Sequence, residues 1–434
     1  MTNKTGNTEA GFGVCGITPD AMAMRDMLLR NAMGASIYAQ HAYEAFRTLK
    51  ATIEGKTPFR ITDLDKLYWF AGQCGVNTKA TPDQVALWLS DFLMYELHRG
   101  YEEPSRIIEV FAPSVRQKVW RDLAIYPAGT LHEIKDAVAS CLINVNGDFI
   151  SLVRKCLRLG ITTIYGAQIG IDMVQDILFG TPMPHEVEVD LGILDPDYVN
   201  IVFNGHEPWE QVTKAISGFS TEAVFKVLGG TLEPLASAIK AAKIKGIVAL
   251  VNCATLATGS HDYVTVSLAK ELIKRDILIV SGGCGNNGLE VAGLCNLDAI
   301  QVAGPGLKEI CGTFKIPPVL SFGTCTYTAR ISMLTTALAN HLGVDSADLP
   351  AAVTAPQYLE QKATIDGMFA LAYGLYTHLS PTPPVAGGRE LVKLLTEDME
   401  GLTGGKIALG DDPLEIAIGI EEHIKKKRAK IGLN

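Results

Sequence analysis

Apolar residues recur every three to four positions through the first 180 residues, which is the spacing of amphipathic helices. The pattern predicts helices at residues 18–53, 61–75, 81–100, 102–122, 131–143 and 147–179. Two of these begin with Thr-Pro, at Thr18 and Thr81, which supplies an N-cap residue and a proline at the first helical position. Residues 1–190 are therefore predicted to form an all-α helical domain, closed by the turn FGTPMP (179–184).

The pattern then changes to short apolar, β-branched runs that alternate with helix-like stretches. Three of the runs are KGIVALVNC (245–253), DILIVSGGC (276–284) and PVLSFGTC (318–325), with helices predicted between and after them at 264–275 and 328–342. Strands that alternate with helices indicate a parallel sheet with right-handed crossovers. The sheet is expected to occupy residues 245–330. An earlier run, DYVNIVFNGH (197–206), predicts a further strand.

The remaining stretches predict connecting and closing elements. Residues 207–218 and 233–246 are helix-like, and so is 355–379, which carries Lys362. Residues 404–428 predict a strand, a turn and a final helix.

The three runs each end in a cysteine, at Cys253, Cys284 and Cys325, and the earlier run ends in His206. The carboxyl ends of parallel strands lie at one edge of the sheet, where ligands bind, so these side chains should converge. One strand-end cysteine would be typical of core packing, because free cysteine behaves as a small apolar residue. Three in succession, each beside a polar or glycine-rich turn, instead favour a metal or iron–sulfur site.

Composition narrows the function further. The formal net charge of −9 is spread along the chain, so neither nucleic acid nor an anionic membrane surface is an expected partner. The basic run KKKRAK (425–430) is expected to be the solvated end of the last helix. Without an export signal, nine cysteines indicate a cytoplasmic protein with thiols or metal ligands rather than disulfides. The loop GGCGNNG lacks the G-x-G-x-x-G spacing, so no nucleotide is expected.

The chain resembles the catalytic subunit family of anaerobic nickel–iron carbon monoxide dehydrogenases, in the superfamily of the hybrid-cluster proteins. The resemblance is carried by collinear segments over most of residues 11–434: GVCGITPD, DILFGTPMP, LGILDPDYVNIVFNGHEP, LEPLASAIKAAKIKGIVALVNC, DYVTVSLAKELIKRDILIVSGGC, KIPPVLSFGTC and APQYLEQKATIDG. It implies an α/β fold in which a helical domain (1–190) precedes a Rossmann-like parallel α/β domain (245–434). Residues 191–244 would be the remnant of a middle α/β domain that is largely missing.

The resemblance also implies a nickel–iron–sulfur cluster, or a [4Fe–4S] cluster, with separate roles for its ligands. His206 would bind the iron outside the cubane, Cys253 and Cys284 would bind cubane irons, and Cys325 would bind nickel. Lys362 would stabilise negative charge on the bound intermediate and pass a proton. The substrate would be a gas, the electron acceptor an external carrier such as ferredoxin, and the protein a homodimer.

The sequence departs from the family pattern at three places. Two cluster cysteines of the missing middle domain are absent, and Asp262, His261 and Glu207 are the candidates near the strand ends to replace them. Only Cys15 remains of the cysteines that would hold the relay clusters. The family's proton-transfer histidines correspond to Tyr38, His41 and Glu44, expected on one solvated face of the first helix, so only His41 keeps an imidazole.

Three functions follow from these observations. The first is a two-electron oxidoreductase that interconverts carbon monoxide and carbon dioxide, or acts on a related small molecule. The second is a hybrid-cluster enzyme that reduces hydroxylamine or a similar nitrogen compound. The third is a non-catalytic or regulatory iron–sulfur protein that has lost carbon monoxide oxidation.

Overall fold

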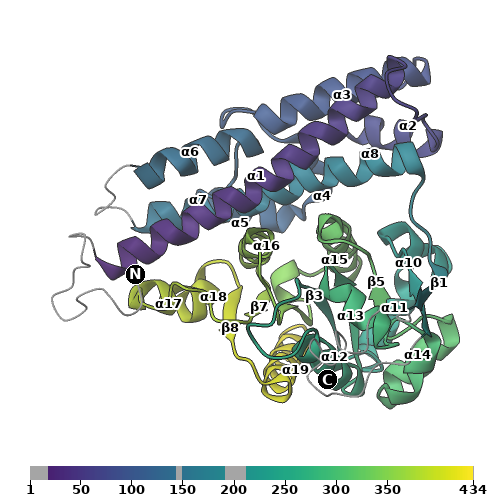
Figure 1. Cartoon of the computed structure of the whole chain (residues 1–434), viewed down its shortest axis with the longest axis vertical. Helices are drawn as coiled ribbons and strands as arrows, with labels where there is room; N and C mark the ends of the chain where they lie inside the picture. The colour runs from purple at the N-terminus through teal and green to yellow at the C-terminus, as the bar shows by residue number, and fades with distance from the viewer. Residues whose placement is uncertain (1–17, 143–148, 191–211, 434) are drawn as a thin grey trace. The chain divides into compact units, whose positions relative to one another are not determined.

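The computed structural model describes residues 18–142, 149–190 and 212–433 (Figure 1). The chain forms two compact units, and neither is a continuous segment. The first comprises Met1–Thr181, Glu360–Gly374 and Pro383–Lys406, and the second comprises Pro182–Leu359, Leu375–Thr382 and Ile407–Asn434. The chain therefore passes between the units five times.

The first unit is helical, as the periodicity predicts. The longest helix, α1 (Pro19–Ile53), begins at its predicted cap: the Thr18 side chain accepts a hydrogen bond from the Ala21 N–H at 3.1 Å. α3 (Pro82–His98) begins in the same way at Thr81. The others up to residue 179 are α2 (Leu64–Gln73), α4 (Arg106–Phe111), α5 (Ser114–Asp122), α6 (Thr130–Leu142), α7 (Phe149–Thr163), the π-helical turn η1 (Ile164–Gln168) and α8 (Ile169–Phe179).

The same unit includes helices from the C-terminal half of the chain. α16 (Gln361–Ala372) packs against both α1 and α7. The contacts are close because each partner helix presents a glycine: a Cβ at Gly160 of α7 would lie 2.5 Å from the Phe369 nitrogen, and one at Gly34 of α1 would collide with the Gln361 carbonyl. The short helices α17 (Arg389–Lys393), η5 (Leu394–Asp398) and α18 (Met399–Leu402) complete the unit.

The second unit is built on an eight-stranded sheet with the order β1-β2-β5-β4-β3-β6-β7-β8. β2, β5, β4, β3, β6 and β7 pair in parallel, and β1 is antiparallel to β2. The strands are β1 (His185–Asp190), β2 (Val212–Ser217), β3 (Gly246–Val251), β4 (Ile277–Gly282), β5 (Val319–Ser321), β6 (Ala351–Ala355), β7 (Tyr376–Leu379) and β8 (Lys406–Leu409). The three strands that precede the cysteines are confirmed, and so are α12 (Tyr263–Lys274), α15 (Thr328–Leu342), β8 and the closing helix α19 (Pro413–Lys430).

Several expectations about this sheet are wrong. Residues 212–217 form a strand rather than a helix, and 185–190 form its antiparallel partner rather than the end of the helical domain. The sheet is not confined to 245–330, because β6, β7 and β8 extend it on the other side of β3. The stretch 355–379 is not all helix, since β7 follows α16. The strand predicted at 197–206 lies outside the described residues.

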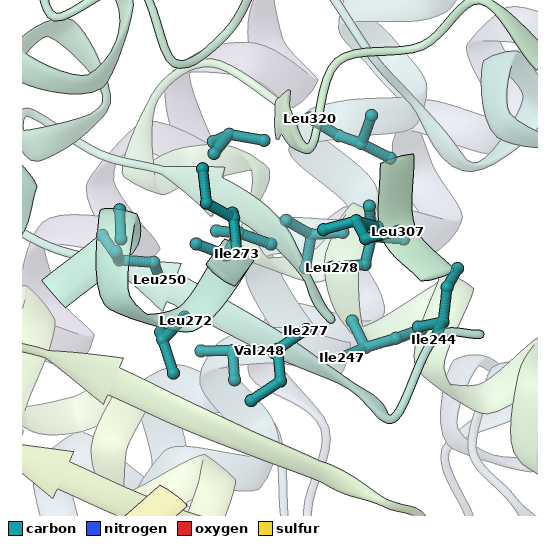
Figure 2. Close-up of a cluster of buried hydrophobic side chains, with 14 of the residues drawn as sticks. Ile244, Ile247, Val248, Leu250, Leu272, Ile273, Ile277, Leu278, Leu307 and Leu320 are labelled. Atoms are coloured by element: carbon teal, nitrogen blue, oxygen red, sulfur yellow. The ribbon is translucent and has the colours of Figure 1, made fainter. Parts of the chain in front are cut away.

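The core of the second unit lies where helices cover the central strands. Figure 2 shows apolar side chains of β3 and β4, among them Val248, Leu250 and Ile277, near Leu272 and Ile273 of α12. All six residues of β4 are buried, which explains why its sequence is a continuous apolar run rather than an alternating one. The other helical segments are α10 (Thr221–Val227), α11 (Glu233–Lys240), α13 (Gly285–Val291), η2 (Leu297–Val302), α14 (Pro305–Phe314), η3 (Cys325–Tyr327) and η4 (Ser346–Asp348).

The C-terminal basic run is only partly solvated, which corrects the expectation that it is simply the exposed end of the last helix. Lys427 and Arg428 of α19 are buried. The Arg428 guanidinium donates hydrogen bonds to the carbonyls of Ile239 at 2.7 Å and Lys245 at 3.1 Å, and so ties α19 to the segment that enters β3.

Candidate metal centre

Three cysteines follow three neighbouring strands of the parallel sheet. Cys253 lies two residues after β3, Cys284 two residues after β4 and Cys325 four residues after β5. These strands are adjacent in the order β5-β4-β3, and the chain then crosses to β6 on the far side of β3. The three thiols therefore lie at the carboxyl edge of one sheet, beside the point where the strand order reverses, which is where such sheets bind ligands.

Backbone hydrogen bonds join the three cysteine-bearing turns beyond the ends of the strands. The Asn252 N–H donates to the Gly282 carbonyl at 3.1 Å, and the Gly283 N–H donates to the Gly323 carbonyl at 2.9 Å. A third bond returns from the Gly285 N–H to the Asn252 carbonyl at 3.1 Å. The turns after β3, β4 and β5 thus form one connected backbone platform.

The glycines of GGCGNNG are required by this platform. Gly283 has φ +86°, a conformation that favours glycine, and a Cβ there would collide with the Asn252 carbonyl. A Cβ at Gly285 would lie 2.6 Å from the Asn252 Nδ2 and 3.0 Å from the Cys253 carbonyl oxygen. The glycine-rich sequence therefore allows the Cys284 turn to approach the Cys253 turn.

The cysteines differ in their access to solvent. Cys284 is exposed, and Cys253 and Cys325 are half-buried. The other described cysteines are buried: Cys74, Cys141, Cys156, Cys295 and Cys311. Burial raises the pKa of the Cys156 and Cys311 thiols to about 12 and raises that of Cys295 as well, so these groups stay protonated at neutral pH. Because a metal ligand must be a thiolate, these cysteines serve as core residues. Cys74, Cys141 and Cys156 accordingly pack in the core of the helical unit.

The thiols of Cys253, Cys284 and Cys325 are better suited to bind a metal–sulfur cluster than a single metal ion. Within residues 18–142, 149–190 and 212–433, no three His, Cys, Asp or Glu side chains are arranged to hold one metal ion. A cluster distributes its thiolates over several irons, so its ligands need not meet at one point. Accessible soft donors on adjacent, backbone-linked turns fit such a group. His206, Glu207 and Cys15 lie outside the described residues.

His261 and Asp262, two of the candidate replacement ligands, form a pair. His261 Nδ1 lies 2.7 Å from the Asp262 carboxylate, which is buried, and the hydrogen bond raises the pKa of His261. A Cβ at Gly288 of α13 would collide with Asp262, so the carboxylate packs against α13 one helical turn beyond Cys284. The pair is thus held next to α13, the helix that directly follows Cys284.

The predicted catalytic residues Lys362 and His41 belong to the first unit. Lys362 lies in the first turn of α16, and its ammonium is 3.3 Å from the Glu360 carboxylate. His41 on α1 is exposed. The prediction that Tyr38 lies on a solvated face of α1 is wrong. Tyr38 is fully buried and donates a hydrogen bond to Asp366 of α16 at 3.0 Å. The reason is geometric: a spacing of three residues drifts around a helix of 3.6 residues per turn.

Sequence reasoning missed the buried polar residues behind the thiols. Asn252, Thr265 and Gln357 are each at most 3% exposed and hydrogen-bond to one another. A signal for Asn252 was available, because it is a polar residue directly between an apolar run and Cys253. Thr265 and Gln357 gave no such signal, since only the fold brings them to Asn252.

Comparison with known proteins agrees with this arrangement. The sequence model of the Prismane/CO dehydrogenase family matches residues 3–217 and 210–414. The carbon monoxide dehydrogenase of Archaeoglobus fulgidus is 38% identical, with 97% of this chain and 90% of that protein covered. Carbon monoxide dehydrogenase 2 of Methanosarcina acetivorans is also 38% identical, with 97% and 89% covered.

Solved structures give the same result. A nickel-free carbon monoxide dehydrogenase from Thermococcus sp. AM4 superimposes with a TM-score of 0.91 at 29% identity, covering 98% of this chain and 88% of that one. Carbon monoxide dehydrogenase IV from Carboxydothermus hydrogenoformans gives 0.90 at 26% identity, covering 97% and 90%.

The alignments also confirm that this chain is short for its family. The Archaeoglobus alignment spans 560 positions against the 434 residues here, so at least 126 positions have no counterpart in this chain. The two family matches meet at residues 210–217, between His206 and Cys253, where the sequence predicts the missing domain. By family match, by identity to its relatives and by fold, the chain belongs to the Prismane/CO dehydrogenase family.

Proposed function

We propose that this chain is a carbon monoxide dehydrogenase-like oxidoreductase that interconverts carbon monoxide and carbon dioxide, or acts on a related small molecule. The observation that carries the proposal is the row of accessible thiols, Cys253, Cys284 and Cys325, on adjacent strand ends joined by backbone hydrogen bonds. The 38% identity to carbon monoxide dehydrogenases supports it.

The cofactor in this proposal is a nickel–iron–sulfur cluster or a [4Fe–4S] cluster, which would supply electron-transfer and Lewis-acid chemistry. Cys253, Cys284 and Cys325 would hold it as thiolates, together with His206. The backbone platform would keep the three cysteines in register. No nucleotide enters the proposal.

Lys362 would act on the substrate through its charge. An ammonium stabilises negative charge that develops on a substrate oxygen, and it can deliver or accept a proton. Its ammonium lies 3.3 Å from the Glu360 carboxylate at the N-terminal turn of α16. His41, which is exposed on α1, would exchange that proton with solvent.

An external electron carrier such as ferredoxin, a homodimeric assembly and a cytoplasmic location complete the proposal. The buried cysteines are free thiols, which suits a reducing compartment. None of the helices in the described residues is long and apolar enough to cross a membrane. Light scattering of the purified protein would test the dimer.

A non-catalytic or regulatory iron–sulfur protein is the second candidate. It is favoured by the at least 126 family positions that this chain lacks, because loss of ligands can leave a cluster that binds without turning over. It predicts iron and sulfide without nickel and without activity.

Metal analysis of anaerobically purified protein tests these alternatives. The catalytic proposal expects iron, sulfide and about one nickel per chain, with nickel lost in Cys325→Ala because a soft thiolate ligand is removed. Cys311→Ala is the matched control, because it removes a buried thiol of α14 in the same unit and should leave the metal content unchanged.

Carbon monoxide-dependent reduction of a viologen dye then tests the substrate. Activity in the wild type that disappears in Lys362→Ala and in Cys325→Ala would support carbon monoxide oxidation. Nickel without this activity would indicate a related small molecule, and reduction of hydroxylamine would identify a hybrid-cluster type of reaction. A folded protein that takes up no metal from replete anaerobic cells would contradict the proposal.

A further inference from the structure

A ring of three buried polar side chains lies behind the turn that carries Cys253. Asn252 follows β3, Thr265 lies in α12 and Gln357 follows β6. Thr265 and Gln357 are fully buried, and Asn252 is 3% exposed. Polar side chains are buried at a cost unless they are hydrogen-bonded, so their partners define what this ring can do.

The hydrogen bonds among the three residues close on themselves. The Asn252 Nδ2 donates to the Thr265 hydroxyl at 2.7 Å, and that hydroxyl donates to the Gln357 Oε1 at 2.8 Å. The backbone N–H of Gln357 then donates to the Asn252 Oδ1 at 2.8 Å. Each member is fixed by the other two, so displacing one leaves buried partners unsatisfied.

The ring also holds the loop that carries Cys253. The Gln357 Nε2 donates to the Thr255 carbonyl at 2.9 Å and to the Ser260 carbonyl at 3.4 Å. Both carbonyls belong to the connection between β3 and α12. The Gln357 side chain, which follows β6, therefore holds the loop between β3 and α12 at two points, Thr255 and Ser260.

The same ring is connected to the Cys284 turn. The Asn252 carbonyl accepts a hydrogen bond from the Gly285 N–H at 3.1 Å, and Gly285 packs directly against the Asn252 side chain. The Cys325 turn is one step further away, because it joins the platform through Gly283 and Gly323. The ring thus acts directly on the turns that carry Cys253 and Cys284, but not on the turn that carries Cys325.

We propose that Asn252, Thr265 and Gln357 are positioning residues that fix the Cys253 loop and the Cys284 turn in ligand-binding geometry before the metal–sulfur group is inserted. The identity of the metal–sulfur group in this proposal rests on the proposed function. The hydrogen bonds that hold the Cys253 loop and the Cys284 turn, however, are present in the metal-free chain. Its physical basis is preorganisation: a loop that is already ordered loses less conformational freedom when the ligand binds.

Substitutions at Thr265 provide a sharp test, since its hydroxyl is the centre of the ring. Thr265→Val keeps the shape but removes the hydroxyl, and Thr265→Ser keeps the hydroxyl. Thr354→Val is the matched control, because Thr354 is a fully buried threonine of the neighbouring strand β6 whose hydroxyl bonds to His378 at 2.8 Å and is not part of the ring.

The first readout is hydrogen–deuterium exchange of the metal-free proteins. Thr265→Val should speed exchange of residues 253–261 about tenfold, the effect of losing about one net buried hydrogen bond. Thr265→Ser should restore the wild-type rate, Thr354→Val should leave this segment unchanged, and residues 323–326 should be unaffected in all three variants. Equal exchange of residues 253–261 in Thr265→Val and Thr354→Val would overturn the proposal.

The second readout is retention of iron and sulfide during challenge with a chelator. Thr265→Val should weaken retention about 10- to 100-fold relative to Thr354→Val, the usual cost of losing a residue that orients a ligand. Equal retention in these two variants would overturn the role in ligand positioning. A wild type without any cluster would instead contradict the proposed function, and the exchange experiment would still decide whether the ring fixes the loop.

If Thr265→Val does not fold, Gln357→Met provides the same test. It leaves the Asn252–Thr265 bond and the Gln357 backbone bond in place and removes only the side-chain bonds to Thr265, Thr255 and Ser260. Faster exchange confined to residues 253–261 would support the proposal, and unchanged exchange would overturn it.

Discussion

Single residues in this protein take their chemical properties from burial and from one or two hydrogen bonds. His378 of β7 is a clear example, since it is 1% exposed and lies between Thr354 and Gly410. The Gly410 carbonyl, 2.9 Å from Nε2, can only accept, so Nε2 carries the proton. Nδ1 accordingly accepts the Thr354 hydroxyl at 2.8 Å. In this arrangement the imidazole is neutral, with Nε2 as the donor and Nδ1 as the acceptor.

Burial lowers the pKa of His378 below its usual value near 6.5. A group whose pKa is lower in the folded state stabilises the fold fully above its unfolded pKa and loses that stabilisation as the pH falls. We therefore expect the free energy of unfolding to decrease below pH 6.5, by up to about 1.4 kcal/mol per pH unit from this residue. Urea unfolding from pH 5 to 7.5 measures it.

His378→Gln is the comparison variant, because glutamine can donate to Gly410 and accept from Thr354 without titrating. The difference in the free energy of unfolding between wild type and this variant, followed against pH, measures the contribution of His378. His261 has the opposite effect in both proteins, because its raised pKa stabilises the fold at low pH. An identical pH dependence in the two proteins would show that His378 does not titrate in the unfolding transition.

At the scale of elements, helix contacts in the first unit depend on glycine. Gly160 of α7 lets α16 approach so closely that any side chain would meet the backbone of Phe369. Gly160→Ala should therefore lower the free energy of unfolding by about 1–3 kcal/mol, the usual cost of overpacking. Thermal or urea unfolding of the purified variant measures this change.

Gly312 of α14 is the matched control. It also lies inside a helix, but a Cβ there meets nothing within 4 Å. Gly312→Ala should be neutral or should raise the free energy of unfolding by up to about 1 kcal/mol, from helix propensity alone. A loss of stability at Gly312 as large as that at Gly160 would contradict the packing argument.

The helices and strands also show which sequence signals are sufficient to predict secondary structure. The Thr-Pro starts of α1 and α3 were predicted correctly because capping is local. β2 was mistaken for a helix because six residues carry too little periodicity to distinguish the two structures. β1, with the sequence HEVEVD, is polar enough that only pairing with β2 makes it a strand.

For the whole molecule, the discontinuity of the units is the main finding. The first unit needs α16 and residues 383–406, which follow the first strands of the sheet in the sequence. Trp120 donates to the Ala372 carbonyl at 2.8 Å and Arg116 to the Thr403 carbonyl at 2.7 Å, so its helices use partners from these late segments. Neither unit can be completed before most of the chain is available.

A fragment of residues 18–181 should therefore be helical but should not unfold cooperatively, because the surfaces that contact α16 remain exposed. Joining residues 360–406 to it through a flexible linker should restore a cooperative transition. Circular dichroism during heating measures whether each protein unfolds cooperatively. Binding of a dye to exposed apolar surface measures whether the helix surfaces that contact α16 are uncovered. A cooperative transition in the shorter fragment would show that the N-terminal helices are sufficient by themselves.

The parts of this protein that depend on local pattern can be predicted from the amino-acid sequence. These are the helices of residues 18–179, the three apolar strands, the cysteine at the end of each strand, and the resemblance that the family match confirms. Periodicity, capping and composition act between near neighbours along the chain, so the sequence shows them directly.

Which distant residues act together depends instead on how the whole chain folds. The fold places α16 among the N-terminal helices, extends the sheet with β6 to β8, and brings Gln357 to Asn252 beside Cys253. These outcomes depend on burial and on hydrogen bonds between residues more than 100 positions apart in the sequence. No local pattern encodes such partners, because each is selected by the packing of the whole fold.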